Sequence, residues 1–103
     1  MNTIKFNNTS FEVESYNKNT SFMGETISSS ASCTITTNNI ELLNTLAQDS
    51  ITSIQIMHNN DLIYNLADID AKIDNISEYL NGDRMGVSVN LTFNVWHFHK
   101  FNV

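Results

Sequence analysis

Two histidines near the end of the chain come nearest to a catalytic or metal-binding pattern. His97 and His99 stand two residues apart, so on an extended strand their rings would point to the same side and could bind one metal ion. Two ligands do not complete a metal site, and His58 or a carboxylate from another strand would have to join them. We therefore interpret the histidines as a surface or interface pair, and we expect neither a bound metal nor a cofactor.

Four carboxylates in the second half of the chain are candidates for acid–base chemistry. They alternate with apolar residues, which is typical of a solvated face rather than of a paired acid and base in a cleft; they are Asp68, Asp70, Asp74 and Glu78. The sequence contains no nucleophile beside a base, no closed set of metal ligands and no phosphate-binding loop. We predict that the protein is not an enzyme, and we identify no small-molecule ligand.

The elements that carry these residues are predominantly strands. Residues 87–95 alternate strictly between apolar and polar types, which predicts a strand of about 30 Å with one buried face; its apolar positions are Val87, Val89, Leu91, Phe93 and Val95. Residues 26–36 repeat the alternation, with Ile27, Ala31, Cys33 and Ile35 on the apolar side. Cys33 is the single cysteine, so we expect a buried, unreactive thiol without an internal disulfide.

Two hairpins are predicted where polar residues separate short apolar stretches. Asn7-Asn8 separates a strand at residues 4–6 from one that carries Phe11, Val13 and Tyr16. Residues 58–61 separate strands at 51–57 and 62–66. Between the first hairpin and the strand at 26–36, we expect residues 17–25 to form a linker.

One short α-helix is predicted near residues 38–48. Ile40, Leu43 and Ala47 fall on one helical stripe. Asn38 is followed three residues later by Glu41, which is the spacing of a capping box and places an acid in the first turn.

Residues 66–80 fit two structures. The first is an amphipathic helix ended by Asn81-Gly82, because apolar residues step by three and four at Leu66, Ile69, Ile73, Ile76 and Leu80. The second is a strand with a bulge near Asp74-Asn75, which turns at residues 81–83 into the terminal strand. Because the terminal strand needs an antiparallel partner, we favour the second structure.

These elements together predict the fold class. A chain of 103 residues has material for one domain, residues 1–103. We predict a mainly β, β-rich α+β fold, in which a twisted antiparallel sheet or small sandwich of about six to eight strands is covered by one short helix.

The net charge and the lack of long apolar runs limit the classes of partner that the protein is expected to bind. Eleven acidic residues against five Lys and Arg give a net charge of −6, which removes the electrostatic basis for binding nucleic acid or an anionic membrane. The sequence shows no signal-peptide pattern and no run near the roughly 20 apolar residues of a membrane span. We expect a protein without a signal peptide or transmembrane segment whose partner is another protein or a second copy of itself.

The segment 96–103 is the candidate interface, with Trp96, His97, Phe98, His99 and Phe101 as its tentative contact residues. If the alternation of residues 87–95 continued, Trp96 and Phe98 would lie on the polar face, and both faces would need cover. One interpretation places this tail in the core of its own domain. The other adds it as a strand to a neighbouring subunit, with Trp and Phe as anchors, and our functional prediction adopts this second interpretation.

Several stretches resemble short bacteriophage proteins from low-GC gut and Firmicute hosts. The resemblance runs through residues 4–13 (IKFNNTSFEV), 15–17 (SYN), 54–56 (IQI), 73–79 (IDNISEY) and 87–93 (VSVNLTF). It covers most of the chain to about Asn94, and none of its motifs is catalytic. The resemblance implies a small β-structured virion component of the tail or baseplate type.

Two functional hypotheses follow from these observations. The first is a non-enzymatic phage structural protein, which assembles by strand pairing and is located in the virion. The alternative is a small acidic phage inhibitor of a host defence enzyme, of the anti-CRISPR kind, which would act in the host cytoplasm. Its carboxylates would occupy a basic groove of that enzyme; they would include Asp68, Asp70, Asp74 and Glu78.

Overall fold

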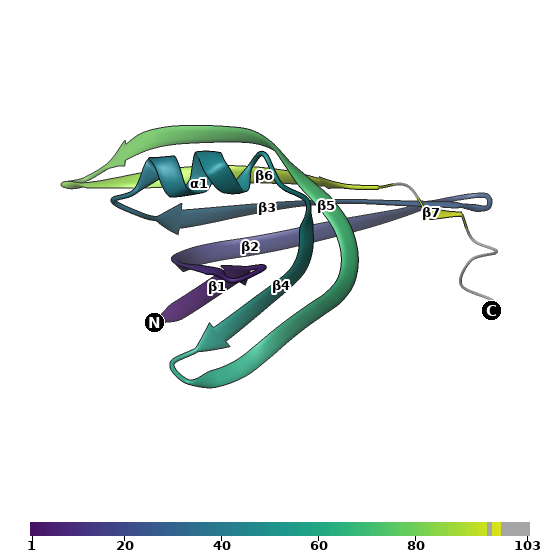
Figure 1. The fold of residues 1–103 in the computed structure, drawn as a ribbon, viewed down its shortest axis with the longest axis horizontal. Helices are drawn as coiled ribbons and strands as arrows, with labels where there is room; N and C mark the ends of the chain where they lie inside the picture. Colours follow the sequence, from purple (N-terminus) through teal and green to yellow (C-terminus); the bar gives the residue numbers. More distant parts are fainter. Residues whose placement is uncertain (95, 98–103) are drawn as a thin grey trace.

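The computed structural model describes residues 1–94, 96 and 97. Most of these residues lie in strands, and one short helix occurs among them, so the predicted mainly β fold is confirmed. Figure 1 shows the elements: β1 (Asn2–Phe6), β2 (Thr9–Met23), β3 (Thr26–Thr36), α1 (Ile40–Leu46), β4 (Ile51–His58), β5 (Asp61–Asn81), β6 (Arg84–Phe93) and β7 (Trp96–His97). In the described part of the chain, no helix is long and apolar enough to cross a membrane.

Six of the seven strands form a sheet that closes on itself. All pairings are antiparallel, in the order β2-β1-β4-β5-β6-β3, and β3 pairs in turn with β2. The short β7 pairs with the first residues of β3, beyond the part of β3 that pairs with β6. The sequence predicted either a single sheet or a small sandwich. The structure has a single closed sheet around one core.

The core lies inside this ring and is apolar, because no polar or charged side chain among the described residues is buried. Leu43 and Leu46 of α1 contribute to it, and Figure 1 shows the helix beneath the arc of β5. The predicted alternation of β3 and β6 is confirmed, since the buried positions include Ala31, Cys33, Ile35, Val87, Val89, Leu91 and Phe93. Val95 lies outside the described residues.

β5 is the longest of the described strands, and it pairs with two neighbouring strands. Its first half pairs with β4 as far as Ala71, and its second half pairs with β6 from Ala71 onward. Straight, its 21 residues would span about 70 Å, whereas the longest axis of the molecule is 48 Å. The strand therefore bends, as its arc in Figure 1 shows.

The bend lies at residues 67–71. Between the pairs Ser53↔Ala67 and Ile51↔Ala71 the register with β4 shifts, because β5 has two more residues than β4 in this interval. Asp68, in the middle of the bend, has a φ of 56°, a left-handed conformation that Asp tolerates better than most residues do.

Residues 66–80 belong to β5, so the strand interpretation is confirmed and the helical one is wrong. The register with β6 shifts between Ile73 and Asn75, which confirms the bulge predicted near Asp74-Asn75. The apolar residues have a helix-like spacing because the bend and the bulge each add residues to β5. After each of them the alternation of apolar and polar residues starts again.

The linker predicted at residues 17–25 is wrong. Residues 17–23 continue β2 and pair with residues 26–32 of β3, and Gly24 forms the turn with a φ of 60°. This hairpin projects beyond the closed ring, to the right in Figure 1. Polar residues occur on both of its faces, so its sequence lacks the alternation that identifies a half-buried strand.

Asn residues form the tight turns, as the sequence predicts for both hairpins. Asn7, between β1 and β2, has a φ of 56°, and Asn59, between β4 and β5, has a φ of 57°. Asn7 also holds the connection from α1 to β4. Its side-chain oxygen accepts from the N–H of Thr52 at 2.8 Å, and its side-chain nitrogen donates to the carbonyl of Ser50 at 3.0 Å.

The helix lies within the predicted range, but its cap differs. The side chain of Asn39, rather than of Asn38, accepts from the N–H of Leu42 at 3.2 Å. The capping box predicted between Asn38 and Glu41 is therefore wrong by one residue. Thr37 helps to make Asn39 the N-cap residue. Its hydroxyl accepts from the N–H of Asn39 at 3.0 Å and so fixes the backbone just before the helix.

Replacement of Phe93 by Ala is expected to lower the free energy of unfolding by about 3–5 kcal/mol, because it leaves a cavity in the core. The control is Asn90→Ala on the polar positions of the same strand, which should cost less than about 1 kcal/mol. Urea denaturation measures both. Small and equal effects would contradict the inward orientation of Phe93.

Replacement of Asn39 by Ala is expected to cost about 1 kcal/mol, because the first turn of α1 loses its side-chain acceptor. Asn38→Ala is the matched control and should change the free energy of unfolding by a few tenths of a kcal/mol at most. Thermal melts followed by circular dichroism would show this difference. A larger loss for the Asn38 variant would mean that the helix begins one residue earlier.

Candidate functional site

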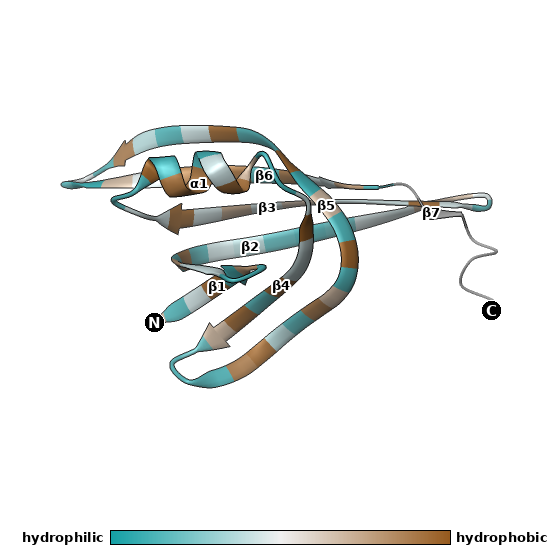
Figure 2. Cartoon of the chain, viewed as in Figure 1, coloured by the Kyte–Doolittle hydropathy of each residue, from teal (hydrophilic) through white to brown (hydrophobic). Residues whose placement is uncertain are grey.

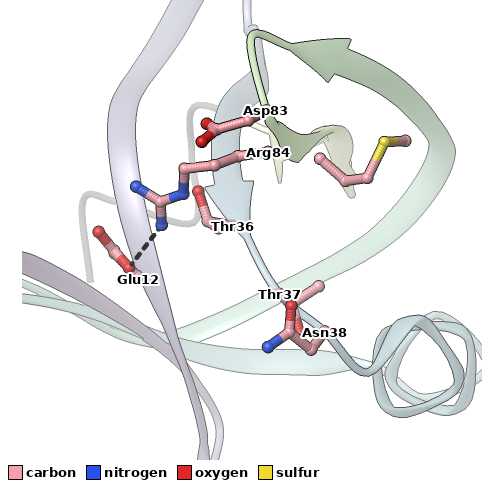
Figure 3. A pocket seen from close by; sticks show the side chains of 7 residues that line it. Glu12, Thr36, Thr37, Asn38, Asp83 and Arg84 are labelled. Carbon is pink, nitrogen blue, oxygen red and sulfur yellow. Dashed lines mark ion pairs between the residues drawn. The ribbon is translucent and has the colours of Figure 1, made fainter.

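A surface hollow of about 460 Å³ lies where the turn between β5 and β6 approaches β2 and the end of β3. Figure 3 shows its lining, which consists of Glu12, Thr36, Thr37, Asn38, Asp83, Arg84 and Met85. An Arg84 nitrogen lies 3.6 Å from a carboxylate oxygen of Glu12, and both side chains are substantially exposed. An exposed ion pair of this kind contributes little to stability. Thr36 is in register with Glu12, but no hydrogen bond among the described residues joins a threonine hydroxyl of the lining to a carboxylate; the Thr37 hydroxyl accepts instead from the N–H of Asn39.

The four predicted acids all lie exposed on β5, but two of them are engaged within the sheet. The side-chain amide of Asn94 donates to the carboxylate of Asp70, and the hydroxyl of Thr92 donates to the carboxylate of Asp74. The N–H of Asn94 also donates to the carbonyl of Asp70 at 2.9 Å. These bonds attach the end of β6 to the bend of β5, so Asp70 and Asp74 serve the fold.

Of the histidine side chains, the structure describes that of His58. His58 is exposed and shares a hydrogen bond of 2.7 Å with the side chain of Asn2. His97 takes part in β7, where its backbone is in register with Thr26. No group of three or more metal-ligating side chains occurs in the part of the chain that the structure describes. His99 lies outside it.

Two tyrosines meet where β2 crosses β5. The rings of Tyr16 and Tyr64 lie 5.3 Å apart between centroids, and their hydroxyls share a hydrogen bond of 3.4 Å. Burial, followed by the contact with Tyr64, raises the pKa of the Tyr16 hydroxyl well above its usual range. Tyr16 is therefore a neutral structural group, which fixes the crossing of the two strands.

Exposed apolar side chains gather at the ends of three hairpins, which the sequence analysis did not identify. Phe22 and Met23 are 67% and 75% exposed at the end of the β2–β3 hairpin, and Leu80 is 72% exposed at the end of the β5–β6 hairpin. Leu62 and Ile63 are exposed beside the turn between β4 and β5, where Figure 2 shows a brown band next to the polar turn. Phe22 and Met23 were missed because residues 17–25 were predicted as a linker.

The β2–β3 hairpin forms one wall of an apolar groove of about 350 Å³. The opposite wall is the bend of β5, and the groove is lined by Lys18, Thr20, Phe22, Ile27, Ser29, Leu66, Ala67, Asp68, Ile69 and Phe93. The ammonium group of Lys18 lies 5.4 Å from the centroid of the Phe93 ring, within the range of a cation–π contact. The groove thus combines an apolar floor with one basic and one acidic side chain.

Two strands leave backbone edges without partners among the described residues. β1 pairs with β2 only as far as Val13, so the same edge of β2 is open from Glu14 to Met23. β4 pairs with β5 only as far as Ala71, so the corresponding edge of β5 is open from Lys72 to Asn81. Open edges present N–H and C=O groups to which another strand can add.

The predicted interface tail is described only in part. Trp96 and His97 form β7, in register with Ile27 and Thr26, whereas Phe98, His99 and Phe101 lie outside the described residues. Ser30 pairs with Thr92 and Ile27 with Trp96, so the tail has one more residue than β3 in this interval. The backbone register of residues 87–93 with β3 is therefore interrupted before Trp96, and the faces expected for the Trp96 and Phe98 side chains remain predictions.

Comparisons of the chain with protein-family models, curated proteins and solved structures found no match. The functional conclusions that follow therefore rest on the sequence and on the geometry described above.

The Cys33 thiol is expected to resist modification in the folded protein. Cys33 is 2% exposed, and burial raises the pKa of its thiol to about 12. The folded state therefore keeps the proton at a pH where the unfolded chain releases it, so the contribution of Cys33 to stability falls as the pH rises from about 9 to about 12. A thiol reagent at pH 7 should label the native protein far more slowly than the urea-unfolded protein. Equal rates would contradict burial.

Proposed function

We propose that this protein is a non-enzymatic assembly subunit that associates with copies of itself or with other proteins through β-strand pairing. The observation that carries the proposal is the projecting β2–β3 hairpin. It combines an open edge from Glu14 to Met23 with exposed apolar side chains at its end, including Phe22. An open edge supplies main-chain hydrogen bonds, and adjacent apolar side chains supply the area that an interface buries.

The composition of this hairpin supports an assembly role over a role in the core. Residues 17–21 of β2 and residues 28–30 of β3 are all polar, so folding alone does not explain why fifteen residues of β2 remain extended. A hairpin of this length gains little from its own two strands in water. It is therefore best explained as an arm that gains stability when a partner covers it.

The biological setting of the proposal rests on the sequence resemblance alone. That resemblance points to a bacteriophage virion component of the tail or baseplate type, for which assembly by strand pairing is a suitable mechanism. The alternative, an acidic inhibitor of a host defence enzyme, needs free carboxylates on β5. It receives less support, because the hydrogen bonds to Asn94 and Thr92 occupy Asp70 and Asp74.

Truncation after Val95 is expected to lower the assembly state while the fold remains. In the described structure only Trp96 and His97 of the removed segment pair with the sheet, so the core loses no buried side chain that we describe. Light scattering coupled to size-exclusion chromatography would give the mass, and a thermal melt would report the fold.

Two results would contradict this expectation. An unchanged assembly mass would show that the tail does not contribute to the contact. Loss of the cooperative thermal transition would show instead that the tail belongs to the core of its own domain.

A further inference from the structure

The groove between the β2–β3 hairpin and the bend of β5 continues the core face of the sheet. Ile27 lies on the same face of β3 as Ala31, Cys33 and Ile35, because alternate residues share a face. Phe22 pairs with Ile27 across the hairpin, and paired residues also share a face. The inner face of the sheet therefore continues along the hairpin into the groove, opposite the bend of β5.

The uncovered floor is sized for one or two aromatic side chains. The groove holds about 350 Å³, and Phe22 remains 67% exposed beside it. Leu66 and Ile69 face this space from the bend of β5 and are only partly buried. An apolar face that continues a core and stays open is a site for an apolar partner.

We propose that this groove binds residues 98–103 of a second copy of the chain, with Phe98 and Phe101 as the inserted side chains. This inference rests on the proposed function and specifies the partner and the acceptor surface for it. A tail of six residues reaches up to about 20 Å, which is enough to cross from one copy to the groove of another. When two copies exchange tails reciprocally, the same contact forms twice around a twofold axis.

The direction of β7 favours a neighbour over the copy's own groove. β7 is antiparallel to β3 and passes from Trp96, opposite Ile27, to His97, opposite Thr26. Because β3 begins at Thr26, the chain at His97 is heading toward the end of the hairpin, and Figure 1 shows β7 beside this end. Between these two residues the chain moves away from Ser29, which lines the groove of the same copy.

The charge of the tail, residues 98–103, is complementary to the charge of the residues that precede it. All eleven acidic residues precede the tail, together with four of the five Lys and Arg, whereas residues 98–103 contain Lys100 and no acid. Asp68 at the rim of the groove is exposed and offers a carboxylate to a lysine that enters with the tail. The contact therefore pairs Lys100 of one copy with Asp68 of the next, while Lys18 lies on the opposite wall of the groove.

Two variants of the full chain test the contact. Phe22→Asp places a charge on the floor of the groove, and deletion of residues 98–103 removes the proposed occupant. The matched control is Ser21→Asp, which adds the same charge to the opposite face of the same strand. Self-association measured by analytical ultracentrifugation should weaken by about 30-fold or more for the first two variants and stay within about threefold of the unaltered chain for the control.

A mixture of the two variants gives the decisive result. The deletion variant keeps an intact groove and the Phe22→Asp variant keeps an intact tail, so an equimolar mixture should form a one-to-one complex that neither forms alone. If both variants are monomeric and the mixture stays monomeric, the tail and the groove do not contact each other, and the inference is overturned.

The remaining outcomes separate this inference from the proposed function. If both variants associate like the unaltered chain, the inference is overturned while assembly through another surface stands. If the unaltered chain itself is monomeric at its highest soluble concentration, the inference is overturned, while strand pairing with a different protein stands. Phe22 and Ser21 are exposed, so we expect both variants to fold; if Phe22→Asp loses its thermal transition, Phe22→Ser replaces it in the mixing experiment.

Discussion

The closure of the sheet depends on the bend of β5. One strand has to pair with β4 at its start and with β6 at its end, and it can do so only if it changes direction between them. The two additional residues between Ala67 and Ala71 supply that change, and the bonds from Asn94 to Asp70 hold the end of β6 against it. Without the bend, β4 and β6 could not lie in one ring, and the core inside it would have no enclosure.

The bend also creates the surface to which we assign function. The regular pairing of β5 with β4 is interrupted after Ala67, and residues 66–69 line the groove together with Lys18 and Thr20 of the β2–β3 hairpin. Phe22 and Ile27 also lie on the hairpin, on the face that the core uses elsewhere. The same geometry that closes the ring thus leaves an apolar groove open at its side, so the fold and the proposed interface have one physical origin.

How much the sequence predicts depends on whether a segment is half-buried. The alternation was predicted for β3 and for residues 87–93 of β6, because one face of each is buried. The bounds of β6 were not, since it begins at Arg84 and ends at Phe93 rather than spanning 87–95. The bulge of β5 was predicted because the terminal strand required a partner. The distal part of β2 was not predicted, since both of its faces are largely exposed and its residues 17–21 carry no apolar alternation. The groove was also missed. Two residues that line it, Leu66 and Phe22, are 44 residues apart in the sequence, and they lie near each other only because of the bend.

The register shift before β7 bears on both the aromatic tail and the groove. Extended without interruption, the alternation of residues 87–95 would put Trp96 on the polar face, which suggested a segment apolar on both sides. The extra residue between Thr92 and Trp96 instead brings Trp96 into register with Ile27, a residue of the groove floor. The tail therefore begins at the groove, in register with its apolar residues, and heads outward along β3. For this reason we propose that the residues after β7 bind the equivalent groove of a neighbouring copy rather than the groove that β7 itself borders.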